Sequence, residues 1–218
     1  DQPIVYQVDR VRDGRRFVTR RVVAHQGKEP IFILAASFQL REDGFEHQTP
    51  APDVPGPEGL QSDLDRYREA ARRLPERASE LWTRERPIEI RLVDPPDLLQ
   101  PRAQEPVKYA WIRAIRELPP DPVLQRALLA YASDFQLLGT ALLPHAQTWL
   151  DPGLKVASLD HAMWFHRDVR LDRWLLYAMD SPSASGARGL NRGSFFDLEG
   201  RLVASVAQEG LIRRRQRR

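Results

Sequence analysis

The stretch DPVLQRALLAYASDFQLL, residues 121–138, predicts one helix around which the rest of the chain is organised. Asp121 is a good N-cap, and Pro122 fits the first helical position, where its missing N–H breaks no hydrogen bond. Gly139 follows as a left-handed C-cap. Because apolar residues leave little polar face, we expect this helix to be buried almost all round. One carboxylate, Asp134, stands near its end among apolar neighbours.

The segments on either side of this helix predict strands. Before it, residues 86–93 alternate apolar and charged side chains, which is typical of a half-buried strand, and residues 108–118 predict another. Within the segments after it, Gly189 and Gly193 are expected at bulges or close approaches. An antiparallel sheet wrapped around a helix is therefore the expected architecture of this part. Its last four strands are predicted at residues 154–167, 174–180, 187–197 and 202–212.

The N-terminal part predicts three strands and no helix. Residues 4–12 and 17–24 flank Asp13 and Gly14, a pair typical of a hairpin turn. Residues 31–40 are a nearly continuous apolar run, which predicts a central strand buried on both faces.

The segment between these parts is rich in proline and glycine over residues 42–60, which predicts a linker. Residues 60–83 are charged with a helical period, broken at Pro75, and predict surface helices over the sheet. The expected domain organisation has four parts: three strands in 1–42, a linker with surface helices in 43–85, a second repeat in 86–214, and a basic tail in 215–218.

Two short echoes relate the two ends of the chain. The sequence YQVD at 6–9 resembles YAMD at 177–180, and AASFQ at 35–39 resembles ASVAQ at 204–208. Together they suggest two copies of one unit, the first without its leading strand and helix.

The composition excludes several classes of protein. Of 218 residues, 42% are hydrophobic and 29% are charged, which is typical of a globular protein rather than a disordered one. No apolar run reaches the roughly 18 residues that span a bilayer. Without cysteine there is no disulfide, thiolate nucleophile or thiolate metal site. The net charge of +3 owes much to the C-terminal arginines, which we expect to be a solvated end rather than a nucleic-acid-binding arm.

Several blocks of sequence carry a family resemblance. They are LAYASDF at 129–135, LDHAMWFHR at 159–167, WLLY at 174–177, SASGARG at 183–189, QEG at 208–210 and, in the N-terminal part, PIFILAASFQ at 30–39. These blocks resemble the acyl-CoA thioesterase II family, the TesB-like enzymes. The resemblance implies an α+β double hotdog fold, in which an antiparallel sheet wraps around a long central helix, with the first repeat incomplete. It also implies hydrolysis of acyl-CoA to fatty acid and CoA.

The resemblance further implies that Asp134, Ser158 and Gln208 are catalytic, because they fall in the matching blocks. Thioester hydrolysis needs a water held beside the carbonyl; a carboxylate can take its proton, while a hydroxyl and an amide orient it. Without the resemblance, Asp134 is better explained as a solvated or arginine-paired carboxylate at a helix end. Ser158 and Gln208 alone would be ordinary strand residues.

Other candidates lie near these blocks. His161 and Trp164 are expected beside the site, although core packing alone would explain the tryptophan. Arg188 and Arg192 are candidates for binding CoA phosphates, against the alternative of ordinary exposed strand arginines. The five histidines lack the spacing of a metal site, so neither a metal nor a cofactor is expected.

The expected partners are an acyl-CoA substrate and further copies of the chain in a dimer or tetramer, with no nucleic acid and no membrane span. The C-terminal tripeptide QRR differs from the Ser-Lys-Leu peroxisomal signal, which favours a bacterial, cytoplasmic enzyme. Two alternative functions stay open: a hotdog enoyl-CoA hydratase or dehydratase using Asp160 and His161, and a non-catalytic acyl-CoA-binding module.

Overall fold

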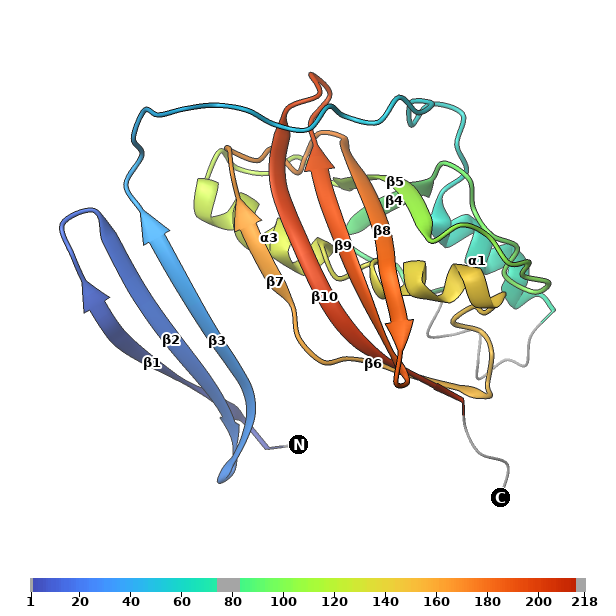
Figure 1. The fold of residues 1–218 in the computed structure, drawn as a ribbon, viewed down its shortest axis with the longest axis horizontal. Helices are drawn as coiled ribbons and strands as arrows, with labels where there is room; N and C mark the ends of the chain where they lie inside the picture. The colour runs from blue at the N-terminus through green and yellow to red at the C-terminus, as the bar shows by residue number, and fades with distance from the viewer. Residues whose placement is uncertain (1, 74–82, 215–218) are drawn as a thin grey trace. The chain divides into compact units, whose positions relative to one another are not determined.

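The computed structural model describes residues 2–73 and 83–214. The chain divides into two compact units, Asp1–His47 and Gln48–Arg218, and Figure 1 shows the elements of each. Within the described residues, no helix is long and apolar enough to cross a bilayer.

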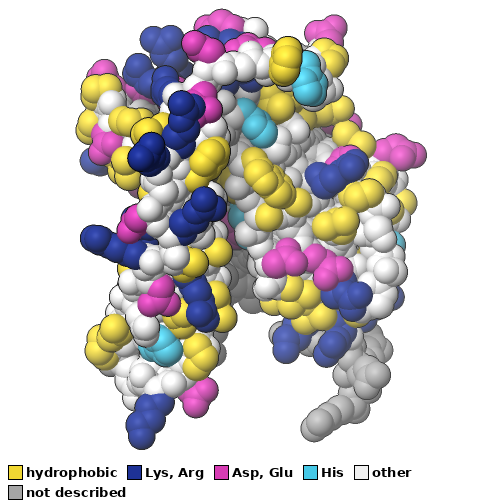
Figure 2. All heavy atoms as spheres, turned by 60° about the vertical axis from the view of Figure 1, so that its left-hand side comes forward, with side chains coloured by type: hydrophobic (Ala, Val, Ile, Leu, Met, Phe, Trp, Pro, Cys, Tyr) yellow, Lys and Arg dark blue, Asp and Glu magenta, His cyan; other side chains and the backbone are white. Residues whose placement is uncertain are grey.

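The first unit is an antiparallel meander, as predicted. Its strands are β1 (Ile4–Asp13), β2 (Phe17–Gln26) and β3 (Glu29–Gln39), in the order β1-β2-β3. The prediction that the apolar run of β3 is a central strand buried on both faces is wrong. β3 is an edge strand in which every residue except Ala36 is exposed. The physical reason is that no helix among residues 2–47 packs on the sheet; Figure 2 shows hydrophobic side chains at the surface, interspersed with Lys and Arg side chains.

The linker between the units packs on the second unit. Ala51, Val54 and Leu60 contact the buried side chains of Trp111, Leu176 and Phe196 on one face of the sheet. Backbone carbonyls of the linker also accept side-chain hydrogen bonds: Pro55 O from Trp111 Nε1 at 2.8 Å and Pro57 O from Arg91 Nη1 at 2.8 Å. The proline-rich segment is therefore a covering layer as well as a connection.

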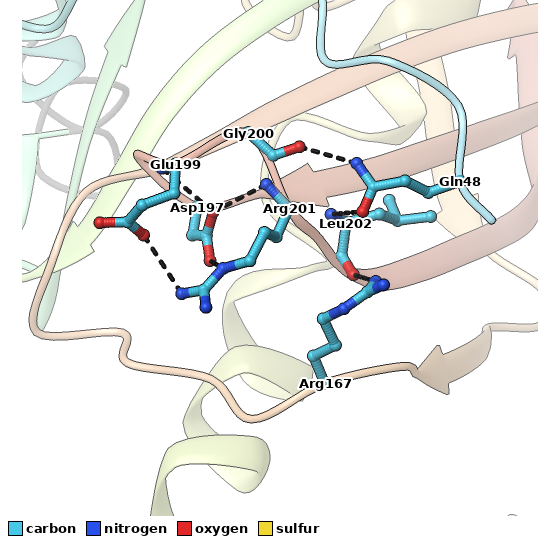
Figure 3. Close-up of polar contacts among 7 residues, drawn as sticks. All are labelled: Gln48, Arg167, Asp197, Glu199, Gly200, Arg201 and Leu202. Carbon is cyan, nitrogen blue, oxygen red and sulfur yellow. Dashed lines mark hydrogen bonds and ion pairs between the residues drawn. The ribbon is translucent and has the colours of Figure 1, made fainter. Parts of the chain in front are cut away.

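The start of the linker is fixed to the turn between the last two strands. Gln48 Nε2 donates to Gly200 O at 2.8 Å, and Leu202 N donates to Gln48 Oε1 at 3.0 Å. Asp197 organises the same turn by accepting from the backbone and the guanidinium of Arg201. Figure 3 shows these contacts around the turn.

One surface helix, α1 (Asp63–Ala71), follows the linker. Ser62 caps it by accepting from Asp65 N, and its buried face contains Tyr67 and Ala70. It packs on the neighbouring strand β4, as predicted for a helix over the sheet. The second predicted surface helix falls largely on residues 74–82, outside the described residues.

The second unit contains one larger antiparallel sheet. Its order is β4-β5-β8-β9-β10-β6, and β7 also pairs with β10. The strands are β4 (Ile88–Leu92), β5 (Val107–Ala114), β6 (Leu154–Ser158), β7 (Ala162–Phe165), β8 (Leu175–Ser185), β9 (Arg188–Phe196) and β10 (Leu202–Arg214).

The predicted strand over 154–167 is interrupted, and the interruption matters for the site. Ser158 pairs with Gly210 and Ala162 pairs with Ala207, so residues 159–161 oppose only Gln208 and Glu209. One extra residue on one strand is a bulge, and bulges redirect side chains near functional sites. The ladder therefore splits into β6 and β7 at the point where His161 occurs.

The core lies between this sheet and the helical segment α3 (Pro122–Ala132), whose Leu129 and Ala132 are fully buried. The rings of Tyr177 and Phe195 stack with centroids 3.9 Å apart. The close approach predicted at glycine is confirmed at Gly193, where an added Cβ would lie 2.3 Å from Tyr177 Cε2. Only glycine lets the backbone pass this ring.

The organising helix begins where predicted and ends earlier. Asp121 caps it by accepting from Val123 N at 2.8 Å, with Pro122 in the first turn. However, it stops at Ala132 rather than residue 138: Phe135 N donates to Ala132 O, three residues back, and Gln136 then adopts a left-handed φ of 69°. The predicted C-cap, Gly139, lies instead within a mostly buried 3-10 helix, η1 (Leu138–His145).

The prediction that the helix is buried almost all round is also wrong. Val123 is 71% exposed and Tyr131 is 51% exposed. The sheet covers the face that contains Leu129, and no described element covers the opposite face to the same extent. An apolar composition indicates a preference for burial, but neighbouring elements decide which side chains are covered.

Candidate active site

The structure brings Asp134, Ser158 and Gln208 together. Gln208 Nε2 lies 2.6 Å from Asp134 Oδ1 and 3.1 Å from Ser158 Oγ. Ser158 Oγ in turn lies 3.4 Å from Asp134 Oδ1. The three side chains come from the turn after α3, the end of β6 and the middle of β10, so three separate elements converge on one point.

The three residues differ in burial. Gln208 is 1% exposed, whereas Asp134 and Ser158 are exposed. The amide therefore lies beneath a carboxylate and a hydroxyl that solvent can reach. Such a group offers a proton acceptor, a hydroxyl and an amide donor within hydrogen-bonding distance of one another, which is suited to binding and activating a water molecule.

His161 belongs to the same cluster. Its Nδ1 lies 3.2 Å from Gln208 Nε2, and its Nε2 lies 2.8 Å from Ser133 Oγ. Burial lowers the pKa of His161, and the negative charges of Asp134 and Asp160 partly oppose this shift. The neutral imidazole is therefore favoured near pH 7.

Ser133 was not predicted from the sequence. It is fully buried at the C-cap of α3, and its Oγ lies 2.8 Å from Ala130 O, a carbonyl of the last helical turn. Its own carbonyl accepts from the buried hydroxyl of Tyr177 at 2.7 Å. Its position next to the candidate carboxylate Asp134 is the one feature of the sequence that could have indicated it. Its partner His161 lies 28 residues away in the chain, so the sequence does not reveal their contact.

Asp160 has a different surrounding from the catalytic candidates. Its Oδ1 accepts from Glu209 N at 2.7 Å, and Leu159 N donates to Glu209 O at 2.9 Å. These bonds fix the bulge against β10. In this arrangement Asp160 stabilises the backbone that bears His161, which gives no support to the alternative of an Asp160–His161 acid–base pair.

The remaining candidates lie outside the hydrogen-bonded cluster. Trp164 is on β7 opposite Ser205 of β10 and is 55% exposed. Arg188 Nε donates to Glu209 Oε1 at 3.0 Å, and Arg192 forms a two-pronged ion pair with Asp180. Both guanidiniums are half exposed, and their binding of CoA phosphates stays a prediction.

A second polar network joins Gln136, in the same turn as Asp134, to Lys108 and Asp63. Lys108 Nζ donates to Gln136 O at 3.0 Å, and Gln136 Nε2 donates to Asp63 Oδ2 at 2.8 Å. Burial lowers the pKa of Lys108 to about 8, opposed by the charge of Asp63, and burial raises the pKa of Asp63. The network links α1 and β5 to the left-handed turn at Gln136.

Two family models match the sequence. The model described as acyl-CoA thioesterase matches residues 78–211, and the model described as acyl-CoA thioesterase N-terminal domain matches residues 1–39. The chain is 42% identical to acyl-CoA thioesterase 2 of Haemophilus influenzae, over 97% of this chain and 74% of the relative. It is 41% identical to acyl-coenzyme A thioesterase 8 of Homo sapiens, over 97% of this chain and 68% of the relative.

Solved structures give the same grouping. The acyl-CoA thioesterase II TesB2 from Mycobacterium marinum is 44% identical and has a TM-score of 0.76, covering 97% of this chain and 74% of that one. A protein with a hot dog fold from Alicyclobacillus acidocaldarius is 18% identical and has a TM-score of 0.74, covering 96% of this chain and 72% of that one. At that identity the likeness shows the hot dog fold alone.

Proposed function

This chain belongs to the acyl-CoA thioesterase family, and from this premise we propose that it hydrolyses acyl-CoA to a fatty acid and CoA using a water bound by Asp134, Ser158 and Gln208. Members of the family are thioester hydrolases, and the chain is one of them. The observation that carries the assignment of residues is the position of Gln208 Nε2, within 2.6 Å of Asp134 Oδ1 and 3.1 Å of Ser158 Oγ.

The proposed reaction needs no covalent acyl-enzyme. Asp134 accepts a proton from water as the water oxygen bonds to the thioester carbonyl carbon. Gln208 and Ser158 both contact Oδ1 of the carboxylate, so we assign Oδ2 as the proton acceptor. The tetrahedral intermediate then collapses, the carbon–sulfur bond breaks, and the proton passes from Asp134 to the CoA sulfur.

The chemical character of the three groups fits this division of roles. A carboxylate can accept the proton, and the neutral hydroxyl of Ser158 and the neutral amide of Gln208 do not compete with it for that proton. All three side chains are fixed by hydrogen bonds to each other and are mounted on a strand, a strand end and a helix end. Such mounting limits the reorganisation needed during the reaction.

We further propose that the two units are parts of two hotdog repeats. The matches of the two family models to residues 1–39 and 78–211 support this proposal. The similarity between AASFQ in β3 and ASVAQ in β10 also supports it, because each sequence lies in a strand of its own antiparallel sheet.

The test is release of free thiol from acyl-CoA substrates of several chain lengths. The protein contains no cysteine, so a thiol reagent reports CoA alone. Replacing Asp134 by Asn removes the proton acceptor and keeps the shape, and kcat is expected to fall about 10²- to 10⁴-fold. The matched control is Asp121→Asn at the other end of α3, where asparagine caps as well as aspartate.

Each outcome decides the proposal. Hydrolysis by the wild type and by Asp121→Asn, with loss in a folded Asp134→Asn, is the expected result. Wild-type kcat in Asp134→Asn would remove Asp134 from the mechanism. Absence of thiol release by the wild type with every acyl-CoA would reject the function.

A further inference from the structure

Ser133 has one hydroxyl proton and two hydrogen-bonding contacts. Ser133 Oγ lies 2.8 Å from Ala130 O and 2.8 Å from His161 Nε2. A carbonyl oxygen can only accept a hydrogen bond, so the hydroxyl donates to Ala130 O. The second contact can then be a hydrogen bond only if His161 Nε2 supplies the proton.

The tautomer of His161 follows from this. A neutral imidazole protonated at Nε2 has a lone pair at Nδ1, which is an acceptor. His161 Nδ1 lies 3.2 Å from Gln208 Nε2, the donor end of the amide. The two nitrogens are therefore a matched acceptor and donor.

The orientation of the Gln208 amide follows in turn. The same Nε2 lies 2.6 Å from Asp134 Oδ1. Rotation of the amide by half a turn would place its oxygen against both the carboxylate and the imidazole lone pair, where like partial charges repel. His161 therefore favours the one orientation in which the amide presents one N–H to Asp134 and the other to His161 Nδ1.

The backbone around this chain of bonds is itself fixed. The fully buried Tyr177 hydroxyl donates to Ser133 O at 2.7 Å, and the carboxylate of Asp160 holds the bulge by accepting from Glu209 N at 2.7 Å. Ser133 and His161 thus approach each other from two anchored segments, the end of α3 and the bulge between β6 and β7.

We propose that Ser133 and His161 are positioning residues, which hold the Gln208 amide with its nitrogen toward Asp134 through the bonds Gln208 Nε2–H to His161 Nδ1 and His161 Nε2–H to Ser133 Oγ. Neither residue touches the substrate in this role. The kinetic part of the proposal rests on the proposed thioesterase function, whereas the tautomer is a property of the resting protein.

The first experiment measures the tautomer by NMR. Two-bond ¹H–¹⁵N correlations on the ¹⁵N-labelled full chain near pH 7 distinguish protonated from bare ring nitrogens, and His161→Asn identifies the signal. The expected result is a proton on Nε2 and a bare Nδ1. A proton on Nδ1, alone or together with one on Nε2, would overturn the proposal.

The second experiment compares variants by kinetics. His161→Ala removes the acceptor for the amide, and kcat is expected to fall about 10- to 100-fold with KM within twofold, as for the loss of a group that orients a catalytic side chain. His161→Asn places a carbonyl oxygen near the position of Nδ1, and we expect it to restore most of kcat. Ser133→Ala is expected to lower kcat less, with a weakened preference for the Nε2–H tautomer.

His166→Ala is the matched control. His166 Nε2 also contacts a serine, Ser205 Oγ of β10 at 2.9 Å, and within the described residues no hydrogen bond links this pair to Asp134, Ser158 or Gln208. We expect its kcat to equal that of the wild type. Wild-type kcat in a folded His161→Ala, or equal loss in His161→Ala and His161→Asn, would overturn the positioning role while leaving thioesterase activity in place.

The two proposals fail differently. If the wild type released no thiol, the proposed function would fall, and the NMR measurement would still decide the arrangement of Ser133, His161 and Gln208. If the wild type were active and the tautomer were Nδ1–H, the function would stand and the positioning role would fall.

Discussion

The two sheets of this protein contain similar apolar strands, but among the described residues the clusters of buried hydrophobic side chains lie in the second unit. In β3 of the first unit, Ile31, Phe32, Ile33 and Leu34 are 41% to 63% exposed. In β8 of the second unit, Leu175, Leu176, Tyr177 and Met179 are at most 3% exposed. The sequences of the two strands alone give no reason for this difference.

The difference comes from the neighbours of each strand. β8 lies between β5 and β9, with side chains of α3 on one face and the linker residues Ala51, Val54 and Leu60 on the other. β3 has one neighbouring strand, β2. An apolar run thus predicts a strand that gains from burial, while the elements packed on it decide whether it is buried.

The largest expected effect contrasts a core residue with an exposed one. Leu129→Ala should destabilise the second unit by about 2–5 kcal/mol, because Leu129 is fully buried and its truncation leaves a cavity. Ile33→Ala in β3 should cost less than about 0.5 kcal/mol, since Ile33 is 63% exposed. Denaturant unfolding followed by far-UV circular dichroism measures both; equal losses would show that β3 is covered in solution.

The sequence was sufficient for much of the fold because its strands have clear periodicity and its turns have clear signals. The meander, the strands of the second unit apart from the division into β6 and β7, and the N-cap of α3 at Asp121 were predicted. The end of that helix was not, because a left-handed Gln136 gives no signal in an apolar sequence. The bulge at 159–161 was missed for a similar reason: it depends on the register with β10.

For the site, the resemblance to a family selected Asp134, Ser158 and Gln208, and the structure brings the three together. Periodicity would not have selected them, since a lone serine or glutamine in a strand carries no signal. The roles of Ser133 and His161 depend on hydrogen bonds between segments distant in the chain. Such pairings become visible only when the fold places the segments side by side.

A smaller loss of stability is expected when a methyl group is added at Gly193, where the backbone passes close to other side chains. Gly193→Ala would place a Cβ 2.3 Å from Tyr177 Cε2 and 2.8 Å from Val206 Cγ1 in the second unit. The overpacked core should lose about 1–3 kcal/mol. The matched control is Gly44→Ala in the first unit, where an added Cβ meets nothing within 4 Å. A loss of stability in Gly44→Ala equal to that in Gly193→Ala would contradict the difference in packing.

The smallest expected effect tests where the second unit begins. Gln48 makes two hydrogen bonds to the β9–β10 turn, to Gly200 O and from Leu202 N (Figure 3). Gln48→Ala should cost about 1 kcal/mol, because two partly buried bonds are lost and each contributes near the lower end of the net range of about 0.5–1.5 kcal/mol. The amide of Leu202 should also exchange faster with solvent, since it loses its acceptor.

The control for this substitution is a glutamine of the first unit. Gln26 Nε2 donates to Gln2 O at 3.1 Å in an exposed position, so Gln26→Ala should change stability by less than Gln48→Ala, within about 0.5 kcal/mol. Unchanged exchange at Leu202 in Gln48→Ala would mean that the linker is not held at this turn. Faster exchange confined to the turn would instead identify Gln48 as the residue that anchors the proline-rich segment to the second sheet, at the start of the second unit.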